Sequence, residues 1–320
     1  MKVLILGAGA LGGYFGGRLH QAGTDVTFLV RAARAEKLRA DGLRIKSPKG
    51  DAALTVKTVG DGALGGPYDL VLLSCKAYDL NSAMDAIAPA VGADTVIVPV
   101  LNGMKHLDAL DARFGRDHVV GGVARIGATL GPDGTVLHSS PFAAVSLGER
   151  DKGRAPRPTV ATFAAALTRA GVDGGLHTDI MQDMWDKWVM LGTLASLTCV
   201  MRAPVGDILA TNDGEAIVRE TIEECRQVAA AAGHEPSAAG LKTVEGIVLA
   251  RGSMFAASLL YDLERRGRVE AEHIVGDLLA RAGAAGLATP NLRFAYAHLQ
   301  AYEYRRAREV AASALMPAAS

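Results

Sequence analysis

The sequence predicts an α/β domain with a parallel sheet, followed by an all-α domain. Three observations support this fold class: strand and helix patterns alternate from the start of the chain, a glycine-rich turn joins the first strand to the first helix, and strand patterns end near Thr178. At about 100 to 200 residues per domain, the length of 320 residues fits two domains. We therefore expect domains at 1–178 and 179–320.

The beginning of the chain has the pattern of a βαβ unit. Lys2–Leu6 is a short run of Val, Ile and Leu that ends at Gly7, and Ala10–Ala22 has helical periodicity. Asp25–Val30 predicts a second strand, and Arg31–Ala40 predicts a second helix. Strands joined through a helix pair in parallel, because the helix packs back on the sheet. This segment therefore predicts the start of a parallel sheet.

Strand and helix patterns continue to the end of the first domain. Strands are predicted at Leu43–Ile45, Leu54–Val56, Asp69–Ser74, Thr95–Val100, His118–Leu130, Val136–Ser139 and Ala144–Leu147. Helices are predicted at Asn81–Val91 and Thr159–Ala170. The turn Gly131–Gly134 (GPDG) is typical of a hairpin, so we expect the sheet to finish with antiparallel strands.

The remainder of the chain is predicted to be helical. Helices are predicted at Asp179–Thr198, Asp213–Ala232, Ala238–Arg266, Val269–Ala285 and Asn291–Ala312. Gly233, Gly267, Gly286 and Pro290 are helix-ending residues between them. The alanine-rich tail after Ala311 predicts disorder.

Composition and charge exclude several classes of protein. Lys plus Arg (34) balances Asp plus Glu (34), so no net charge attracts nucleic acid or an anionic membrane. The longest uncharged apolar run, Trp188–Met201, is shorter than the roughly 20 residues of a membrane helix, and glycines interrupt the apolar stretch that starts at Met1. Cys75, Cys199 and Cys225 are far apart, which argues against disulfides and a structural zinc. We expect a cytoplasmic protein without a nucleic-acid partner, a membrane partner or a metal site.

A glycine-rich turn follows the first strand and opens the first helix. It matches G-x-G-x-x-G and consists of Gly7, Ala8, Gly9, Ala10, Leu11 and Gly12. In such a turn the first glycine allows the tight bend, the second lets the backbone approach a pyrophosphate, and the third lets helix and strand pack closely. The helix N-terminus also favours an anion. The motif predicts that the first domain is a Rossmann-type dinucleotide-binding domain.

The end of the second strand indicates which dinucleotide binds. An Asp or Glu about 20 residues after the turn would bind the ribose 2′-OH of NAD. This chain has Val30 and Arg31 there, and Arg31 together with Arg34 could hold a 2′-phosphate through planar guanidinium groups. The sequence therefore predicts NADP in preference to NAD.

Two polar residues follow apolar strands of the predicted sheet. Lys76 comes after the strand that ends at Ser74, and Asn102 comes after the strand that ends at Val100. Open α/β sheets bind ligands at the carboxyl ends of their strands. We therefore expect Lys76 and Asn102 to share a site with the glycine turn.

Six segments of the chain, in the same order, resemble one protein family. They read GAGALG (7–12), SCKAYD (74–79), VLNGM (100–104), DMWDKW (183–188), the segment 258–270 and LATPNLRFAYAHL (287–299). Together they are similar to ketopantoate reductase (2-dehydropantoate 2-reductase) across nearly the whole chain. The resemblance implies a Rossmann domain, a helical domain and reduction of a 2-oxo acid with NADPH, as in the step from 2-dehydropantoate to pantoate in pantothenate biosynthesis.

The resemblance also implies roles for individual residues. It places the turn 7–12, Arg31 and Lys76 on NADPH. It places Asn102 near the nicotinamide and the substrate, Lys187 as the catalytic lysine, Ser258 on the substrate carboxylate and Glu270 beside the lysine. The chemistry of the lysine fits: hydride delivery to a ketone develops negative charge on oxygen, which an ammonium can stabilise and protonate. Pairing with a carboxylate raises a lysine pKa, so only burial could lower it.

The chain departs from the family at two positions in the expected substrate site. Leu191 and Ala195 stand where the family has asparagines that hold the distal hydroxyl of the substrate. At roughly 100° per residue, both share a helix face with Lys187. This face therefore predicts an apolar wall and favours 2-oxo acids with apolar side chains, because only a polar site selects strongly for a hydroxyl. The alternative is a local shift that brings a hydroxyl into the pocket, from Thr193, Ser196 or Thr198.

Three functions remain open at this point. The first is an NADPH-dependent 2-oxo acid reductase, with ketopantoate among its substrates. The second is a D-2-hydroxy acid dehydrogenase for aliphatic or aromatic 2-oxo acids, which an apolar wall would suit and which could use NAD. The third is a dinucleotide-binding sensor without turnover, against which the joint presence of Lys187 and Glu270 argues. The sequence leaves open the oligomeric state, a homodimer included, and the direction of the reaction.

Overall fold

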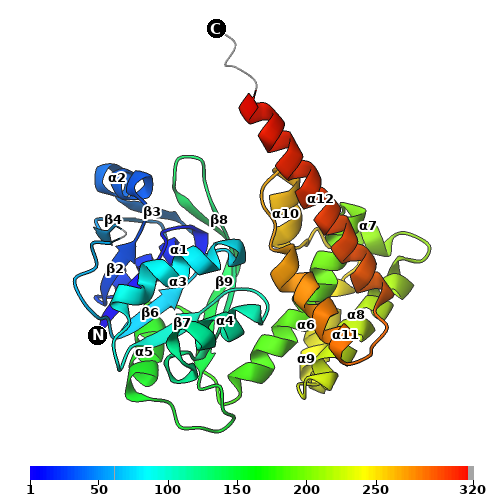
Figure 1. Cartoon of the computed structure of the whole chain (residues 1–320), viewed down its shortest axis with the longest axis horizontal. Helices are drawn as coiled ribbons and strands as arrows, with labels where there is room; N and C mark the ends of the chain where they lie inside the picture. Colours follow the sequence, from blue (N-terminus) through cyan, green and yellow to red (C-terminus); the bar gives the residue numbers. More distant parts are fainter. Residues whose placement is uncertain (61, 316–320) are drawn as a thin grey trace. The chain divides into compact units, whose positions relative to one another are not determined.

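The computed structural model describes residues 1–60 and 62–315, and the chain divides into two compact units (Figure 1). The first comprises Met1–Leu101 and Lys105–Met184, and the second comprises Trp185–Ser320 with the short segment Asn102–Met104. The first unit is α/β with a parallel sheet, and the second is helical, so the predicted fold class is confirmed. Along the chain, the boundary between Met184 and Trp185 falls inside one helix, a few residues beyond 178/179. The division into functional domains at 178/179 stays a prediction.

A five-stranded parallel sheet, in the order β5-β2-β1-β6-β7, forms the centre of the first unit. Its strands are β1 (Lys2–Leu6), β2 (Asp25–Leu29), β5 (Lys57–Val59), β6 (Leu70–Leu73) and β7 (Val96–Pro99). Strand β1 pairs in parallel with both β2 and β6, and Leu6 lies opposite Leu29 and Leu73. The carboxyl ends of these three central strands therefore lie side by side, as the βαβ pattern predicts.

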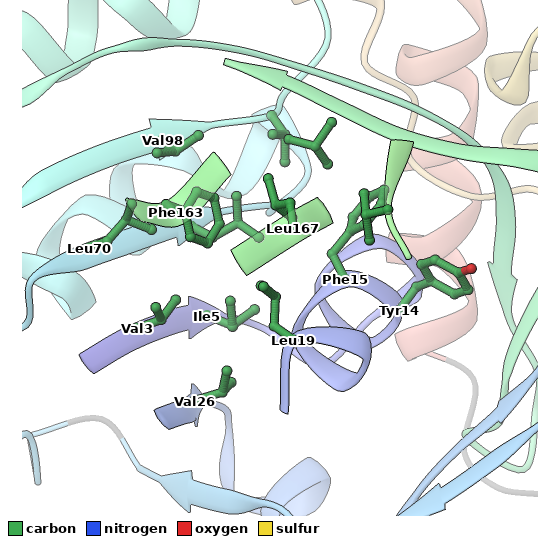
Figure 2. Close-up of a cluster of buried hydrophobic side chains, with 14 of the residues drawn as sticks. Val3, Ile5, Tyr14, Phe15, Leu19, Val26, Leu70, Val98, Phe163 and Leu167 are labelled. Carbon is green, nitrogen blue, oxygen red and sulfur yellow. The ribbon is translucent and has the colours of Figure 1, made fainter. Parts of the chain in front are cut away.

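Helices cover this sheet and close its core. They are α1 (Ala10–Gln21), α2 (Ala32–Asp41), α3 (Leu80–Ile87), α4 (Lys105–Phe114) and α5 (Pro158–Arg169), with the 3-10 turns η1 (Ala77–Asp79), η2 (Ala88–Ala90) and η3 (Arg116–His118). In Figure 2, Phe15 and Leu19 of α1 and Phe163 and Leu167 of α5 gather near Ile5 of β1, and all five are fully buried. Burying each such side chain stabilises the fold by about 1.5–3 kcal/mol. The sequence analysis missed α4.

The first unit also contains a second sheet, which the sequence analysis treats as the end of the first. Its order is β10-β9-β3-β4, and β8 pairs with β9. Its strands are β3 (Leu43–Lys46), β4 (Ala52–Leu54), β8 (Gly121–Leu130), β9 (Val136–Gly148) and β10 (Asp173–Leu176). Strands β8 and β9 form the expected antiparallel hairpin. The strands predicted at 136–139 and 144–147 are one strand, because β8 pairs with β9 from end to end with one irregularity.

Two other strand predictions need correction. The predicted strand Leu54–Val56 is wrong, because Leu54 ends β4 in the second sheet and Lys57 begins β5 in the first. The two residues between them pass from one sheet to the other. Strand β10 was missed because its Gly174 and Gly175 have low strand propensity; pairing with β9 makes it a strand.

The second unit is built from helices. They are α6 (Ile180–Met201, which begins in the first unit), α7 (Val205–Leu209), α8 (Gly214–Ala231), α9 (Ala238–Val248), α10 (Ser258–Glu264), α11 (Asp277–Ala284) and α12 (Pro290–Leu315). A π-helical turn, η4 (Glu272–Gly276), leads directly into α11. Within the described residues, none of the helices has both the length and the apolar character needed to cross a membrane.

Three helix predictions in this unit differ from the structure. The predicted helix Ala238–Arg266 is two helices, because residues 249–257 leave the helix and Gly252 adopts a φ of +70°. The predicted helix Val269–Ala285 contains the π-helical turn. Helix α12 continues beyond Ala311 to Leu315, so the predicted disorder is wrong for 312–315; residues 316–320 lie outside the described part of the chain. The short α7 was missed.

Candidate functional site

The glycine turn of the first unit has the backbone that its motif predicts. Gly7 has a φ of +85°, a left-handed conformation that favours glycine, and its N–H donates to the carbonyl of Leu29 at 2.9 Å. A Cβ on Gly12 would collide with the carbonyl of Gly7, so α1 starts this close to the turn only with glycine. A Cβ on Gly9 would meet no atom of the described residues within 4 Å, so their packing does not explain the glycine there.

Arg34 of α2 is bonded to this turn. Its Nε and Nη2 donate to the carbonyl oxygen of Ala8 at 3.0 and 2.7 Å. Burial lowers the pKa of Arg34 from its usual value, although the guanidinium stays charged. The sequence indicated that Arg34, together with Arg31, could hold a 2′-phosphate, and this role stays a prediction. In the structure two donors of Arg34 bond to the turn, a contact that no local pattern indicates.

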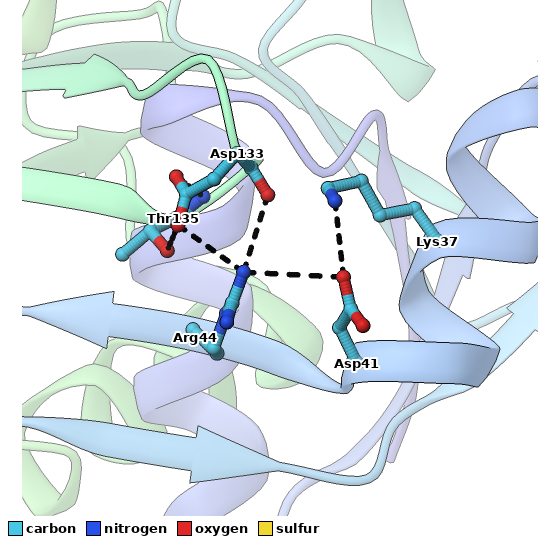
Figure 3. Close-up of polar contacts among 5 residues, drawn as sticks. All are labelled: Lys37, Asp41, Arg44, Asp133 and Thr135. Atoms are coloured by element: carbon cyan, nitrogen blue, oxygen red, sulfur yellow. Dashed lines mark hydrogen bonds and ion pairs between the residues drawn. The ribbon is translucent and has the colours of Figure 1, made fainter.

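A hairpin turn packs beside α2, and polar contacts through Arg44 join the two (Figure 3). A Cβ on Gly134 would collide with the side chains of Arg34 and Lys37, so the β8–β9 turn lies directly against α2. Arg44 of β3 bridges this turn and the end of α2, with its Nη2 at 3.2 Å from Asp133 and 3.9 Å from Asp41. Hydrogen bonds from Thr135 hold the pKa of Asp133 below its usual value. These contacts tie α2 to the second sheet.

Arg31 lies at the N-cap of α2, where its side chain is 83% exposed. Its Nη2 is 3.6 Å from a carboxylate oxygen of Asp79, the last residue of η1. The same turn begins directly after Lys76, whose carbonyl accepts a hydrogen bond from the N–H of Asp79 at 2.9 Å. The structure therefore brings Arg31 next to the segment that carries Lys76, and it adds Asp79, which the sequence analysis did not single out.

Lys187 and Asn102 form the centre of a second site. The Nζ of Lys187 donates to Oδ1 of Asn102 at 3.0 Å, although the two residues are far apart in the sequence. Both belong to the second unit, because the segment Asn102–Met104 groups with α6 rather than with its chain neighbours. Lys76 belongs to the first unit. A site shared by Lys76, Asn102 and the glycine turn therefore stays a prediction.

The other predicted substrate residues also lie in the second unit. Glu270 is 5% exposed and stands just before η4, where its carbonyl accepts from the N–H of Ile274 at 3.1 Å. Ser258 is exposed and begins α10. An exposed serine hydroxyl is accessible to a ligand, so the role of Ser258 on the substrate carboxylate stays a prediction.

The apolar side of α6 contains the two residues that depart from the family. Leu191 is half-buried and Ala195 is 1% exposed. Three hydroxyls could replace the missing amides through a local shift of α6. Those of Thr193 and Ser196 are buried to the same degree as Ala195, so burial does not separate this alternative from the apolar wall, and it stays a prediction. Thr193 lies against Cys225 of α8, where burial raises the pKa of the thiol to about 12 and Thr193 opposes the rise. Thr198 donates to the carbonyl of Leu194 at 2.7 Å, and Ser196 is 2% exposed.

Comparison with known proteins identifies the family. The family model described as ketopantoate reductase PanE/ApbA matches residues 3–152, and the model of its C-terminal part matches residues 179–303. The chain belongs to the ketopantoate reductase family, and the resemblance noted in the sequence is confirmed. It is an oxidoreductase family of 2-oxo acid reductases. The Bacillus subtilis protein named uncharacterized oxidoreductase YkpB is 34% identical over 303 residues, which cover 95% of this chain and 99% of that protein.

Solved structures agree with this assignment. A 2-dehydropantoate 2-reductase from Geobacter metallireducens is 30% identical, with a TM-score of 0.83 over 94% of this chain and 99% of that one. A D-mandelate dehydrogenase solved with NADH and anilino(oxo)acetate has a TM-score of 0.85 over 96% of this chain and 99% of that one. Its identity is 22%, so it shows a shared fold and no more.

Proposed function

We propose that the protein reduces a 2-oxo acid to the 2-hydroxy acid with NADPH, and that 2-dehydropantoate, which would become pantoate, is the first substrate to test. The observation that carries the proposal is the hydrogen bond of 3.0 Å from Lys187 to Asn102, in a chain of this family. The amide oxygen orients the ammonium, and the positive charge of the ammonium can stabilise a substrate oxygen.

The residues of the first unit fit a dinucleotide. Gly9 is the N-cap of α1, and no atom of the described residues accounts for its missing side chain, as expected where backbone approaches a pyrophosphate. The N-terminus of α1 favours that anion. Arg31 would hold the 2′-phosphate of NADP, because its side chain is exposed and no acid stands at the end of β2. When bound, the reduced nicotinamide supplies the hydride.

Lys187 acts on the oxygen of the ketone. As the carbonyl carbon gains a hydride, its oxygen becomes an alkoxide, and the ammonium stabilises this charge and transfers one proton to it. The products are the 2-hydroxy acid and a neutral lysine, which takes a proton back from water. Asn102 orients the ammonium before transfer. Ser258 would hold the substrate carboxylate, and Glu270 would help to restore the charge on the lysine.

The apolar wall of α6 favours a second candidate, a D-2-hydroxy acid dehydrogenase for aliphatic or aromatic 2-oxo acids. Leu191 and Ala195 offer no hydrogen bond to a distal hydroxyl. Such a dehydrogenase could use NAD, so NADH is the second cofactor to test.

A substrate panel tests the proposal. Ketopantoate, 2-oxoisovalerate, pyruvate and phenylglyoxylate would each be mixed with the purified protein and either NADPH or NADH, and oxidation of the cofactor followed by absorbance. We expect turnover of at least one 2-oxo acid, faster with NADPH, and almost none in a Lys187→Ala control. Tight binding of NADPH without turnover of any 2-oxo acid would instead support the dinucleotide-binding sensor.

A further inference from the structure

The π-helical turn η4 begins at Glu272, two residues after Glu270. A π-turn inserts an extra residue into a helix, disturbs the regular hydrogen-bond pattern and is frequent at functional sites. Here it spans Glu272–Gly276 and continues into α11. Two successive backbone carbonyls of this turn contact neighbours of the lysine site. The carbonyl of His273 lies against Gly103, and the carbonyl of Ile274 accepts a hydrogen bond from Trp188.

The first contact fixes the helix that carries the lysine. Nε1 of Trp188 donates to the carbonyl of Ile274 at 2.9 Å, and the side chain is 1% exposed. Trp188 follows Lys187 directly on α6. A buried indole N–H needs a hydrogen-bond partner. This bond therefore fixes how α6 is rotated about its axis, and where it lies along that axis, next to Lys187.

The second contact fixes the segment that carries the asparagine. Gly103 has a φ of +77°, and a Cβ on it would collide with the carbonyl of His273. The same Cβ would lie 3.8 Å from Nε1 of Trp188. Only glycine therefore allows the backbone after Asn102 to rest on the π-turn, beside the indole that binds the next carbonyl.

One turn thus supports both ends of the bond between Lys187 and Asn102. We propose that Trp188 and Gly103 are positioning residues of the reductase, which act through η4 to hold the lysine and the asparagine at hydrogen-bond distance. The inference rests on the proposed function, because it assigns the bond to proton delivery. Displacement of reacting groups by about 1 Å can cost as much as 10²-fold in rate, so a support of this kind is functionally significant.

Ordinary core packing is the competing explanation, and the neighbouring tryptophan separates the two. Trp185 is 2% exposed, and its ring lies 4.9 Å from that of Trp188 and 5.7 Å from that of His234. The guanidinium of Arg281 lies over both indoles, at 5.7 and 5.5 Å. Both tryptophans are therefore core residues of similar size and surroundings, but it is Trp188 that donates to η4.

The test compares Trp188→Phe with Trp185→Phe. Both changes keep an aromatic ring and remove an indole N–H. With a 2-oxo acid that the wild type reduces, we expect Trp188→Phe to lower kcat by about tenfold and to shift the pH dependence of kcat, while the Kd for NADPH stays the same. Trp185→Phe should keep the kcat and the pH profile of the wild type, even where its Tm falls equally. Gly103→Ala should reproduce the effects of Trp188→Phe.

A second readout does not need turnover. Carbon NMR of lysine-labelled protein follows the titration of Lys187, identified by its absence in Lys187→Ala. Loss of the Asn102 acceptor removes a bond to the charged form, so the pKa of Lys187 should fall in Trp188→Phe and stay unchanged in Trp185→Phe. Equal effects of both variants on kcat and titration, or no effect of Trp188→Phe, would overturn the inference. If the pKa of Lys187 changes in the two variants as expected but the wild type reduces no 2-oxo acid, the result would contradict the proposed function alone.

Discussion

The glycine turn of the first unit and the lysine site of the second are built in different ways. The turn consists of consecutive residues and presents backbone groups, with Arg34 as the side chain bonded to it. The lysine site joins Asn102, Lys187 and η4, which are distant in sequence. In the proposed function, dinucleotide binding depends on local backbone, whereas proton delivery depends on long-range side-chain placement. Substitutions in one should therefore leave the function of the other nearly intact.

The largest expected effect is that of Lys187→Ala. Loss of the proton donor should lower kcat by about 10²-fold or more, because general acid catalysis contributes on this scale. The Kd for NADPH should stay close to that of the wild type, since the glycine turn is unchanged. Steady-state kinetics and a fluorescence titration with NADPH measure the two quantities. An equal loss of affinity and rate would show that this lysine is structural.

Arg34→Ala should weaken cofactor binding at the glycine turn of the first unit. Without its two bonds to the Ala8 carbonyl, the turn is less well fixed, and NADPH and NADH should both bind more weakly, by about tenfold; charge-assisted hydrogen bonds contribute about 1.5 to 3 kcal/mol each. Arg34→Lys, which keeps the charge, should recover part of the affinity. A loss confined to NADPH would mean that Arg34 contacts the 2′-phosphate after all.

Arg31→Asp should change selectivity instead. Removing the clamp and adding a negative charge should weaken NADPH by about tenfold or more relative to NADH. Asp79→Asn provides the opposite control: it releases Arg31 from its exposed ion pair, so NADPH should bind more tightly, by no more than about fivefold. If the two cofactor constants of Arg31→Asp move together, Arg31 does not select the cofactor.

A change of similar size is expected in substrate preference. Leu191→Asn combined with Ala195→Asn should raise the ratio of kcat/KM for ketopantoate to that for 2-oxoisovalerate by roughly tenfold, because a hydroxyl buried without a partner costs about 1 to 3 kcal/mol. Single replacements should do less, since neighbours on one helix face need not act additively. Leu191→Met, which keeps an apolar wall, should leave the ratio unchanged.

Much of the first unit could be predicted because its signals are local. The βαβ order, the glycine turn and the parallel pairing of β1 with β2 all follow from short periodic segments. Strand β10 and the separate second sheet could not be predicted in the same way, because pairing with β9 rather than sequence pattern defines them. The hairpin signal at Gly131–Gly134 was clear, but its packing against α2 is a tertiary contact.

The candidate site shows the same limit. The family resemblance identified Lys187, Asn102 and Glu270 as candidate site residues. How they are arranged in space could be learned only from the structure. No pattern indicates that Asn102–Met104 joins the unit of Lys187, that Arg34 binds the turn, or that a π-turn follows Glu270. The contacts at these places join residues that are far apart in the chain.

The most direct test of the account is the ratio of kcat/KM for 2-oxoisovalerate to that for ketopantoate, measured with NADPH on the wild-type protein. Ketopantoate carries a distal hydroxyl that 2-oxoisovalerate lacks, so the ratio reports how the wall formed by Leu191 and Ala195 treats that group. We expect both acids to be reduced and 2-oxoisovalerate to be used at least as well. A preference for ketopantoate by orders of magnitude would contradict the apolar wall, and reduction of neither acid would contradict the assignment of Leu191 and Ala195 to the wall of a site for aliphatic 2-oxo acids.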